Sequence, residues 1–275
     1  MKQIAVLITC HNRKAKTLRC LESLHLQNGL DSRYAINVFL VDDASTDGTG
    51  DLVNQKFPNV KVVQGDGNLY WNRGMHLAWE KASLTERYDY YLWLNDDIIL
   101  FTDALNELLD CKEYNIGPTI ICGSTCSEIG NSYTYGLSTV GGKRIIPNNN
   151  YTCGTLMNGN CVLVSHEIFE LIGNLDPIYP HAIGDYDYGL RLIKQGGKLI
   201  TTTKFIAYCE KNHRLPNWCY AETPLFKRIQ SLYSPLGNCH PKYYFVYEFR
   251  HYGLATALKH FLSIHLRLLM PSLWR

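Results

Sequence analysis

Short, fully apolar runs alternate with amphipathic stretches along the first 100 residues. Runs without polar positions are typical of strands buried on both faces, and apolar residues at three- and four-residue spacing are typical of helices. The pattern predicts strands at residues 4–9, 35–41, 60–63 and 88–94, with helices at 14–27, 49–57 and 72–83. Strands that alternate with helices favour right-handed βαβ units. We therefore expect an α/β fold with a Rossmann-like, mostly parallel central sheet flanked by helices.

The pattern changes after residue 100. It predicts irregular strands and turns at 117–151 and helices at 165–172, 185–195, 224–233 and 243–269. Neither an internal repeat nor a low-complexity linker separates these segments. We expect one α/β unit over residues 1–200, with halves of about 1–100 and 101–200, and a dependent helical extension over 201–275.

The composition supports a large folded core. Of the 275 residues, 46% are hydrophobic and 19% are charged, so the chain can bury enough apolar surface to fold. The net charge of +2 conceals a division. Residues 1–197 hold 16 Lys and Arg against 22 Asp and Glu, whereas residues 198–275 hold 11 against 3. This contrast predicts different partners for the two parts.

Three features predict a cytoplasmic protein. The ten cysteines form no CxxC pair, which favours reduced thiols. The apolar run at residues 4–8 is too short for a signal peptide, and no segment approaches the roughly 18 apolar residues of a membrane-spanning helix. A zinc site built from Cys122 and Cys126, or from the irregularly spaced Cys and His residues between 209 and 240, is a weaker alternative.

Polar clusters follow three predicted strands, at residues 9–13, 42–43 and 95–97. Ligands of α/β sheets bind at the carboxyl ends of the strands, so these clusters should meet in one crevice. The adjacent carboxylates of Asp96 and Asp97 repel each other, and a hard cation such as Mg²⁺ or Mn²⁺ would compensate them. Asp42 and Asp43 suit hydrogen bonds to a base and a ribose. For both pairs, a turn or a helix cap is the alternative.

A further acidic cluster lies at the start of a predicted helix, in residues 184–191. Asp185 or Asp187 at the tip of this helix would be placed to accept a proton as a general base. The alternatives are that these carboxylates stabilise the helix dipole, and that Asp187 pairs with Arg191 one turn later. Other enzyme classes lack their motifs, because the chain has no GxxxxGK(S/T) loop, GxGxxG fingerprint, GxSxG elbow or HExxH helix.

The order and spacing of these segments resemble glycosyltransferase family 2, the inverting nucleotide-sugar transferases of the GT-A fold. Within it, the chain is most similar to rhamnosyltransferase-like bacterial members. The resemblance rests on residues 9–13 (TCHNR), 41–49 (VDDASTDGT), 67–74 (GNLYWNRG), 94–97 (LNDD), 158–159 (NG) and 184–191 (GDYDYGLR). It implies that the nucleotide is contacted by Thr9, His11, Asn12, Arg13, Asp42, Asp43, Asn68, Trp71, Asn72, Arg73 and Asp96.

The resemblance also implies a divalent cation, Mn²⁺ or Mg²⁺, as cofactor. Asp97 is its strongest expected ligand, because Asn95 takes the place of the first carboxylate in the family's DXD motif. Asp96 would contact the ribose or bind the metal weakly. His213 lies where some relatives carry a metal-binding histidine, although a surface or core histidine is the alternative.

The expected reaction is a single displacement at the anomeric carbon, with inversion. Asp185 occupies the position of the family's base. Gly184 stands where the family has a glutamate, which leaves Asp187 as a rival. The donor expected first is dTDP-rhamnose, followed by UDP-hexoses and UDP-galactofuranose. The acceptor would be a glycan or a lipid-linked glycan of a surface polysaccharide in the cell envelope.

Alternative functions stay open at this point. One is a sugar-nucleotide-binding or glycan-binding protein without turnover, and another is a nucleotidyltransferase. The basic, leucine-rich tail has two interpretations: a helix packed on the core or on a second subunit of a homo-oligomer, or an interfacial helix on the inner face of the cytoplasmic membrane. Nucleic acid is not an expected partner, since no recognised binding motif accompanies the basic residues.

Overall fold

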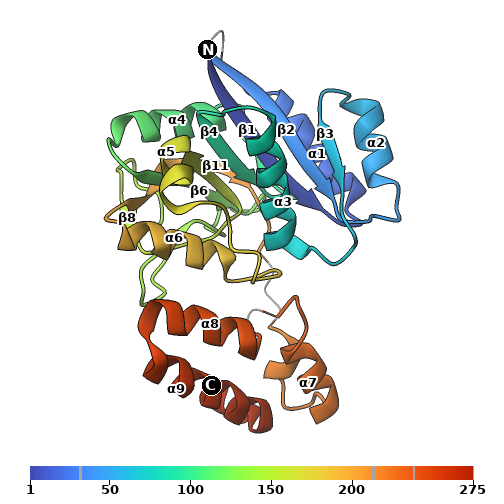
Figure 1. Ribbon diagram of the computed structural model, residues 1–275, viewed down its shortest axis with the longest axis vertical. Helices are drawn as coiled ribbons and strands as arrows, with labels where there is room; N and C mark the ends of the chain where they lie inside the picture. The colour runs from blue at the N-terminus through green and yellow to red at the C-terminus, as the bar shows by residue number, and fades with distance from the viewer. Residues whose placement is uncertain (31–32, 212–214, 238, 275) are drawn as a thin grey trace.

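A nine-stranded mixed sheet forms the centre of the molecule in the computed structural model, which describes residues 1–30, 33–211, 215–237 and 239–274 (Figure 1). Its strand order is β3-β2-β1-β4-β10-β6-β11-β5, and β8 pairs with β11. The strands are β1 (Lys2–Cys10), β2 (Tyr34–Asp42), β3 (Lys61–Gln64), β4 (Tyr90–Leu94), β5 (Ile99–Leu100), β6 (Thr119–Cys126), β8 (Cys153–Gly154), β10 (Cys161–Ser165) and β11 (Lys198–Tyr208). A separate two-stranded sheet pairs β7 (Leu137–Ser138) with β9 (Leu156–Met157).

Helices cover both faces of the main sheet, and a further group follows it in the chain (Figure 1). They are α1 (Lys14–His25), α2 (Thr49–Lys56), α3 (Tyr70–Thr85), α4 (Ala104–Tyr114), α5 (His166–Ile172), α6 (Gly184–Lys194), α7 (Leu225–Leu232), α8 (Pro241–Tyr252) and α9 (Leu254–Leu269). The fold is therefore α/β, with a central sheet between two helical layers. We call α7–α9 the helical unit.

Alternate residues of the central strands enter two separate cores. In β1, Val6 and Ile8 pack with Leu21 of α1 and Leu105 of α4, whereas Leu7 packs in a second core with Trp79 of α3. Side chains of a strand alternate between the two faces, so a strand covered on both sides must be apolar at every position. This burial explains why the fully apolar runs in the first 100 residues predicted strands.

Strands β1 to β4 agree with the predicted segments, and the pairs β1–β2, β1–β4 and β2–β3 are parallel. Strand β10 departs from this direction, because it runs antiparallel to both β4 and β6. Strand β6 has the apolar residues 120–122 near its start and continues with mostly polar ones, yet all its residues are buried. Its Ser124 hydroxyl lies 2.7 Å from that of Thr201, and Thr125 pairs with Thr134 at 2.8 Å. Paired hydroxyls allow a polar sequence to occupy the centre of a sheet.

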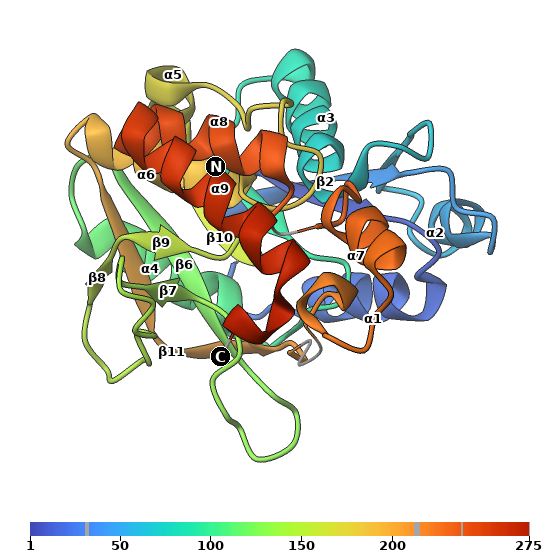
Figure 2. The same ribbon diagram turned by 90° about the horizontal axis from the view of Figure 1, so that it is seen from below.

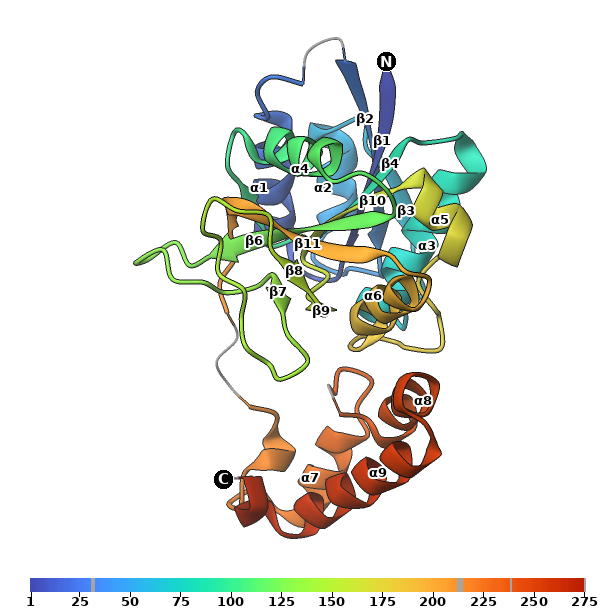
Figure 3. The same cartoon turned by 90° about the vertical axis from the view of Figure 1, so that its left-hand side faces the viewer.

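The prediction of one helix over residues 243–269 is wrong. The structure has two helices, α8 and α9, separated by Gly253. Gly253 has φ 86° and ψ 170°, a backbone conformation that ends one helix and begins the next. The two helices lie side by side, and α8 lies between α6 and α9 (Figure 3). Strand β11 continues to Tyr208, beyond the predicted boundary at residue 200.

The helical unit lies at the end of the sheet where the parallel strands β1, β2 and β4 finish (Figure 1). Seen from below, α8 and α9 extend across this end beside α6 (Figure 2). The unit is therefore placed to close the crevice that the polar strand ends were predicted to form.

A buried carboxylate joins the helical unit to α6. Asp187 of α6 is fully buried, and its Oδ1 lies 2.8 Å from Arg250 Nη1 and 2.9 Å from His251 Nε2, both in α8. Its Oδ2 accepts a hydrogen bond from Arg191 Nε at 3.0 Å, and the Tyr179 hydroxyl donates to Oδ1 at 3.2 Å. Burial alone would raise the pKa of Asp187, but the hydrogen bond from His251 and the charges of Arg191 and Arg250 outweigh it and lower the pKa.

Replacement of this carboxylate should destabilise the protein more than replacement of a more exposed one. We expect Asp187→Asn to lower the free energy of unfolding by on the order of 3 kcal/mol, because two arginines lose their buried partner. Asp176 also binds Arg250, at 2.7 Å, but its side chain is 27% exposed against 1% for Asp187. Asp176→Asn is therefore the matched control, with a smaller expected loss. Equal losses in urea denaturation would contradict this role.

The same carboxylate predicts a dependence of stability on pH. A folded pKa below the unfolded value gives stabilisation that is present above the unfolded pKa and is lost as pH falls through the folded pKa. The Asp187→Asn variant should therefore lose less stability than the wild type on acidification, as measured by urea denaturation at a series of pH values.

Candidate functional site

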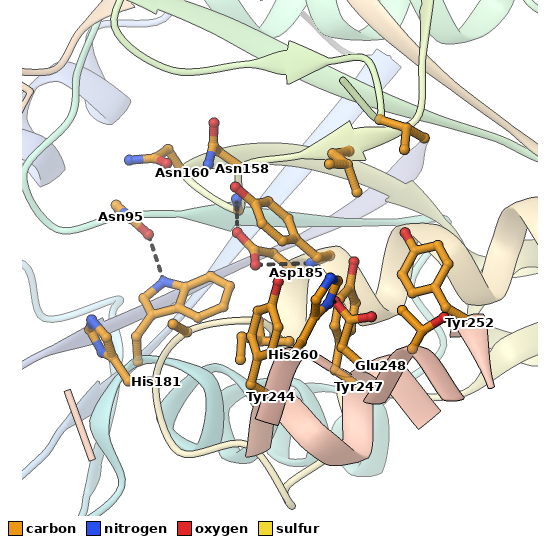
Figure 4. A pocket seen from close by; sticks show the side chains of 18 residues that line it. Asn95, Asn158, Asn160, His181, Asp185, Tyr244, Tyr247, Glu248, Tyr252 and His260 are labelled. Atoms are coloured by element: carbon orange, nitrogen blue, oxygen red, sulfur yellow. Dashed lines mark hydrogen bonds and ion pairs between the residues drawn. The ribbon is translucent and has the colours of Figure 1, made fainter. Parts of the chain in front are cut away.

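Two cavities lie between the strand ends and the helical unit. The larger, of about 950 Å³, contains residues from the ends of β1, β2 and β4, and we call it the strand-end cavity. The smaller, of about 570 Å³, lies between α6 and the helices α8 and α9, and we call it the helix-side cavity (Figure 4). Four residues line both cavities: Trp71, Asn95, Asn160 and His181. The Trp71 indole donates a hydrogen bond to Asn95 Oδ1 at 2.7 Å, which fixes part of this shared wall.

The paired carboxylates Asp96 and Asp97 lie in the strand-end cavity beside two basic residues. Arg13 Nη1 is 2.8 Å from Asp96 Oδ1 and 3.1 Å from Asp97 Oδ2, and Lys16 Nζ is 3.7 Å from Asp97 Oδ2. Burial raises the pKa of Asp96 to about 6, although the charge of Arg13 opposes the shift. The side chain of Asp97 is 20% exposed and is thus the more accessible carboxylate.

These two carboxylates fit a divalent cation, such as Mg²⁺, that is also bound by the phosphates of a substrate. Among the described residues, no group of three or more His, Cys, Asp and Glu side chains is arranged to hold a metal. Mg²⁺ is commonly bound by one or two carboxylates, with phosphate oxygens of a substrate completing the shell. Asp97 with Asp96 supplies this donor set. His213 lies outside the described residues, so its predicted role as a ligand stays a prediction.

The second acidic pair shapes the loop that borders the strand-end cavity. Asp43 accepts backbone hydrogen bonds from Gly67 at 2.7 Å and from Leu69 and Tyr70 at 3.0 Å. Asp43 lines this cavity, whereas Asp42 lines neither cavity and accepts a hydrogen bond from the Ser45 backbone. The structure therefore brings only Asp43 of this pair to the site.

The other residues predicted to contact a nucleotide divide into two groups. Thr9, His11, Arg13 and Trp71 line the strand-end cavity. Three side chains outside both cavities bind loops. Asn12 accepts hydrogen bonds from the backbone of Thr46 and Asp47, Asn72 donates to the carbonyls of Asp176 and Tyr179, and Arg73 donates to the carbonyl of Pro177. Asn68 also lies outside both cavities and is exposed. Most of these bonds join segments that are far apart in the sequence, so these motif positions support the site indirectly.

Asp185 lies in the first turn of α6 and faces the helix-side cavity (Figure 4). Its Oδ2 accepts a hydrogen bond from the Gly159 backbone and its Oδ1 from that of Tyr186, both at 2.9 Å. Burial raises the pKa of Asp185 to about 6, and the backbone hydrogen bonds oppose the shift. Such a carboxyl is ionised at neutral pH and holds a proton more readily than an ordinary aspartate, which suits a general base.

Asp187, the other predicted candidate for the base, is not brought to either cavity. Its carboxylate is fully buried among Arg191, Arg250 and His251, as described above.

The structure also explains why a glycine precedes Asp185. A Cβ atom at Gly184 would overlap Asn72 Oδ1, so the side chain of Asn72 fills the space that a larger residue would need.

Several residues that line the cavities were missed by sequence reasoning. Lys16 lies in α1, one turn beyond Arg13, and its ammonium group is close to Asp97. No sequence motif marks this residue. His181 lines both cavities, and burial together with the charge of Arg13 lowers its pKa. The helical unit adds Tyr244, Tyr247, Glu248, Tyr252, Thr256 and His260 to the helix-side cavity. Glu248 could have been noticed in the sequence, because it is one of only three acidic residues in the basic stretch 198–275.

The comparisons with known proteins identify a family and a fold. The family model described as Glycosyl transferase family 2 matches residues 5–172. No curated protein matches the chain.

Among solved structures, the mannosyltransferase PcManGT from Pyrobaculum calidifontis in complex with GDP-Man and Mn²⁺ has a TM-score of 0.58 at 17% identity. The match covers 96% of this chain and 69% of that chain. TarS 1–349 of S. aureus in complex with UDP has a TM-score of 0.57 at 15% identity, with 92% and 72% covered. Its complex with UDP-GlcNAc scores 0.56 at 15% identity, with 92% and 73% covered. At these identities the likeness shows a shared fold.

Proposed function

Because this chain belongs to glycosyl transferase family 2 and has the GT-A fold, we propose that it transfers a sugar from a nucleoside-diphosphate donor to a glycan hydroxyl, with inversion. One observation carries the proposal: the two cavities share Trp71, Asn95, Asn160 and His181. The phosphate-binding groups would then lie on one side of the anomeric carbon and Asp185 on the other. Inversion requires this arrangement, since the acceptor attacks opposite the leaving group.

The strand-end cavity is the proposed donor site. Arg13 and Lys16 would offset the charge of the diphosphate, and Asp43 would contact the base or ribose. A divalent cation held by Asp97, with Asp96, would supply a Lewis acid for the leaving nucleoside diphosphate. In this proposal Arg13 exchanges its ion pairs with the two carboxylates for contacts to phosphate oxygens.

Asp185 is the proposed base, and its geometry favours it over Asp187. The carboxylate of Asp185 faces a cavity, and its partners are neutral backbone N–H groups. The carboxylate of Asp187 is surrounded by cationic side chains that stabilise its ionised form. A base must take up a proton during the reaction, so the environment of Asp185 suits this role and the cationic environment of Asp187 does not.

The proposed base predicts both the effect of a substitution and a pH profile. We expect Asp185→Asn to reduce transfer by about 10²- to 10⁴-fold, because the amide cannot accept the proton. The variant should still bind the donor. In the wild type, kcat/KM should fall below a pH of about 6, because the protonated carboxyl cannot act as a base. Near wild-type transfer by Asp185→Asn would show that another residue is the base.

The donor and the metal can be tested together by thermal unfolding. From the resemblance described above, dTDP-rhamnose is the donor we propose first, with UDP-hexoses and UDP-galactofuranose as alternatives. Ligand at about 100 times its Kd adds about 2.7 kcal/mol to the folded state, so a true donor should raise Tm. We expect a larger increase with Mn²⁺ than without it, and we expect Asp97→Asn to remove the part that depends on Mn²⁺. Asp103→Asn, on an exposed side chain, is the control.

Product analysis separates the alternative functions. A glycosyltransferase releases a nucleoside diphosphate from the donor, whereas a nucleotidyltransferase releases pyrophosphate from a nucleoside triphosphate and a sugar phosphate. A binding protein without turnover would show a donor-dependent increase in Tm and no release of either product.

The helical unit also presents an apolar surface that supports contact with a membrane. No helix in the described part of the chain is long and apolar enough to cross a bilayer. On α9, however, Leu258, Leu262 and Leu266 are 46%, 66% and 51% exposed and recur every four residues along one face. Lys259 is exposed beside them. We propose that this face binds the surface of an anionic bilayer, where leucines enter the headgroup boundary and basic residues attract lipid phosphates.

Liposome flotation tests the membrane proposal. The wild type should float with vesicles that contain phosphatidylglycerol and less with pure phosphatidylcholine vesicles. The double variant Leu258→Glu, Leu262→Glu should stay at the bottom of the gradient. Leu84→Glu is a matched control, because Leu84 is 75% exposed in α3. A wild type that fails to float would contradict the membrane proposal. A dimer that the double variant disrupts would instead assign the face to protein contacts.

A further inference from the structure

One wall of the helix-side cavity is built by the helical unit. Tyr244, Glu248 and Tyr252 recur every four residues along one face of α8, and His260 of α9 lies beside them (Figure 4). The other wall carries Asp185, from α6. A molecule in this cavity would therefore contact the proposed base on one side and these tyrosine, glutamate and histidine side chains on the other.

Glu248 is the unusual member of this wall. The residue is only 3% exposed. Its Oε1 lies 3.0 Å from His260 Nδ1. Its Oε2 is buried and makes no hydrogen bond of normal geometry to any described residue. Burial and the nearby Glu248 carboxylate raise the pKa of the Tyr244 hydroxyl. A buried carboxylate oxygen without a partner is costly to the folded protein, so its presence in a cavity wall points to a ligand that supplies the missing hydrogen bond.

The chemistry of the wall indicates what this ligand is. A carboxylate accepts hydrogen bonds and repels phosphate, so the ligand donates hydrogen bonds and is not anionic at this point. The rings of Tyr244 and Tyr247 offer apolar faces and hydroxyl groups beside it. A sugar ring has the matching surface, since its C–H groups are apolar and its hydroxyls donate hydrogen bonds.

We propose that Glu248 and His260 form an acceptor subsite that binds the hydroxyls of a neutral sugar. This proposal deepens the proposed glycosyltransferase function by naming the class of acceptor that the helix-side cavity takes. Glu248 would accept hydrogen bonds from the sugar through Oε2, and the tyrosines would cover the ring. The subsite orients the acceptor toward Asp185 and takes no part in the bond changes. A phosphate group of a lipid-linked acceptor would lie outside this wall.

Binding of simple glycosides tests the subsite without any need for turnover. The probes are the methyl glycosides of rhamnose, galactose, glucose and N-acetylglucosamine, observed by saturation-transfer NMR with the Asp185→Asn protein. At least one should bind, and Glu248→Gln should raise its Kd about 10- to 100-fold, because a hydrogen bond to a charged group is lost. His260→Asn should weaken binding in the same direction. Glucose 6-phosphate should bind more weakly than glucose.

The controls separate a binding role from a structural one. Glu222→Gln removes an exposed acidic residue from the same part of the chain and should change no affinity. In the active enzyme, Glu248→Gln should raise the KM for the acceptor, while the Tm increase caused by the donor and the hydrolysis of the donor by water stay unchanged. The unchanged donor readouts would show that the variant is folded.

Two outcomes would overturn the subsite: no glycoside binds the protein, or the glycosides bind Glu248→Gln as tightly as the protein with Glu248. Failure of the proposed function looks different. In that case no donor is consumed by the active enzyme, whatever the glycosides do.

Discussion

The buried carboxylate of Asp187 is the interaction on which the geometry of the candidate site depends. It lies two residues after Asp185 on α6 and binds Arg250 and His251 of α8. The helix-side cavity has one wall from α6 and the other from α8 and α9. The contact between α6 and α8 therefore determines the distance between the two walls. A buried ion pair is weak evidence for stability in itself, since desolvation offsets much of the attraction. Its consequence here is the fixed position of the helical unit.

Three aspartates show how the surroundings determine what a carboxylate can do. Burial raises the pKa of Asp96 and Asp185 to about 6, because the groups near them compensate their charge incompletely. Asp187 is also buried, but hydrogen bonding to His251 and two arginines lower its pKa. Asp187 therefore stays ionised and holds structure together. The other two gain free energy from a cation or a proton, which is the property that a metal ligand or a base needs.

Much of the fold could be predicted from the first 100 residues, because strands buried on both faces must be apolar throughout. Their polar ends were expected to meet, and Arg13, Asp43 and Asp97 do line one cavity. The polar second half of strand β6 could not be predicted in this way, since its buried hydroxyls find partners outside the strand. The break at Gly253 was missed because glycine costs only about 1 kcal/mol within a helix and does not by itself end one.

The candidate site was predictable where it follows a motif and unpredictable where it depends on packing. The pairing of Asp187 with Arg191 follows from their spacing of four residues, but the contacts with Arg250 and His251 join residues more than 60 positions apart. Local sequence thus leaves both Asp185 and Asp187 as candidates for the base, and the contacts of Asp187 with α8 help to separate them. The same holds for Glu248, whose neighbours in the cavity come from α6 and α9.

The helical unit gives a physical reason for the division of charge along the chain. Successive residues of a helix are about 100° apart, so His260 lies nearly opposite Leu258 and Leu262 on α9. One face of this helix lines the helix-side cavity, and the other exposes leucines to the surroundings. If both proposals hold, a single helix contacts the sugar of a lipid-linked acceptor on one side and the bilayer that carries it on the other. Basic residues suit the second contact, whereas acidic residues are needed after β4 to hold a metal and in α6 to accept a proton. The acidic stretch 1–197 and the basic stretch 198–275 would then reflect two adjacent surfaces with opposite electrostatic requirements.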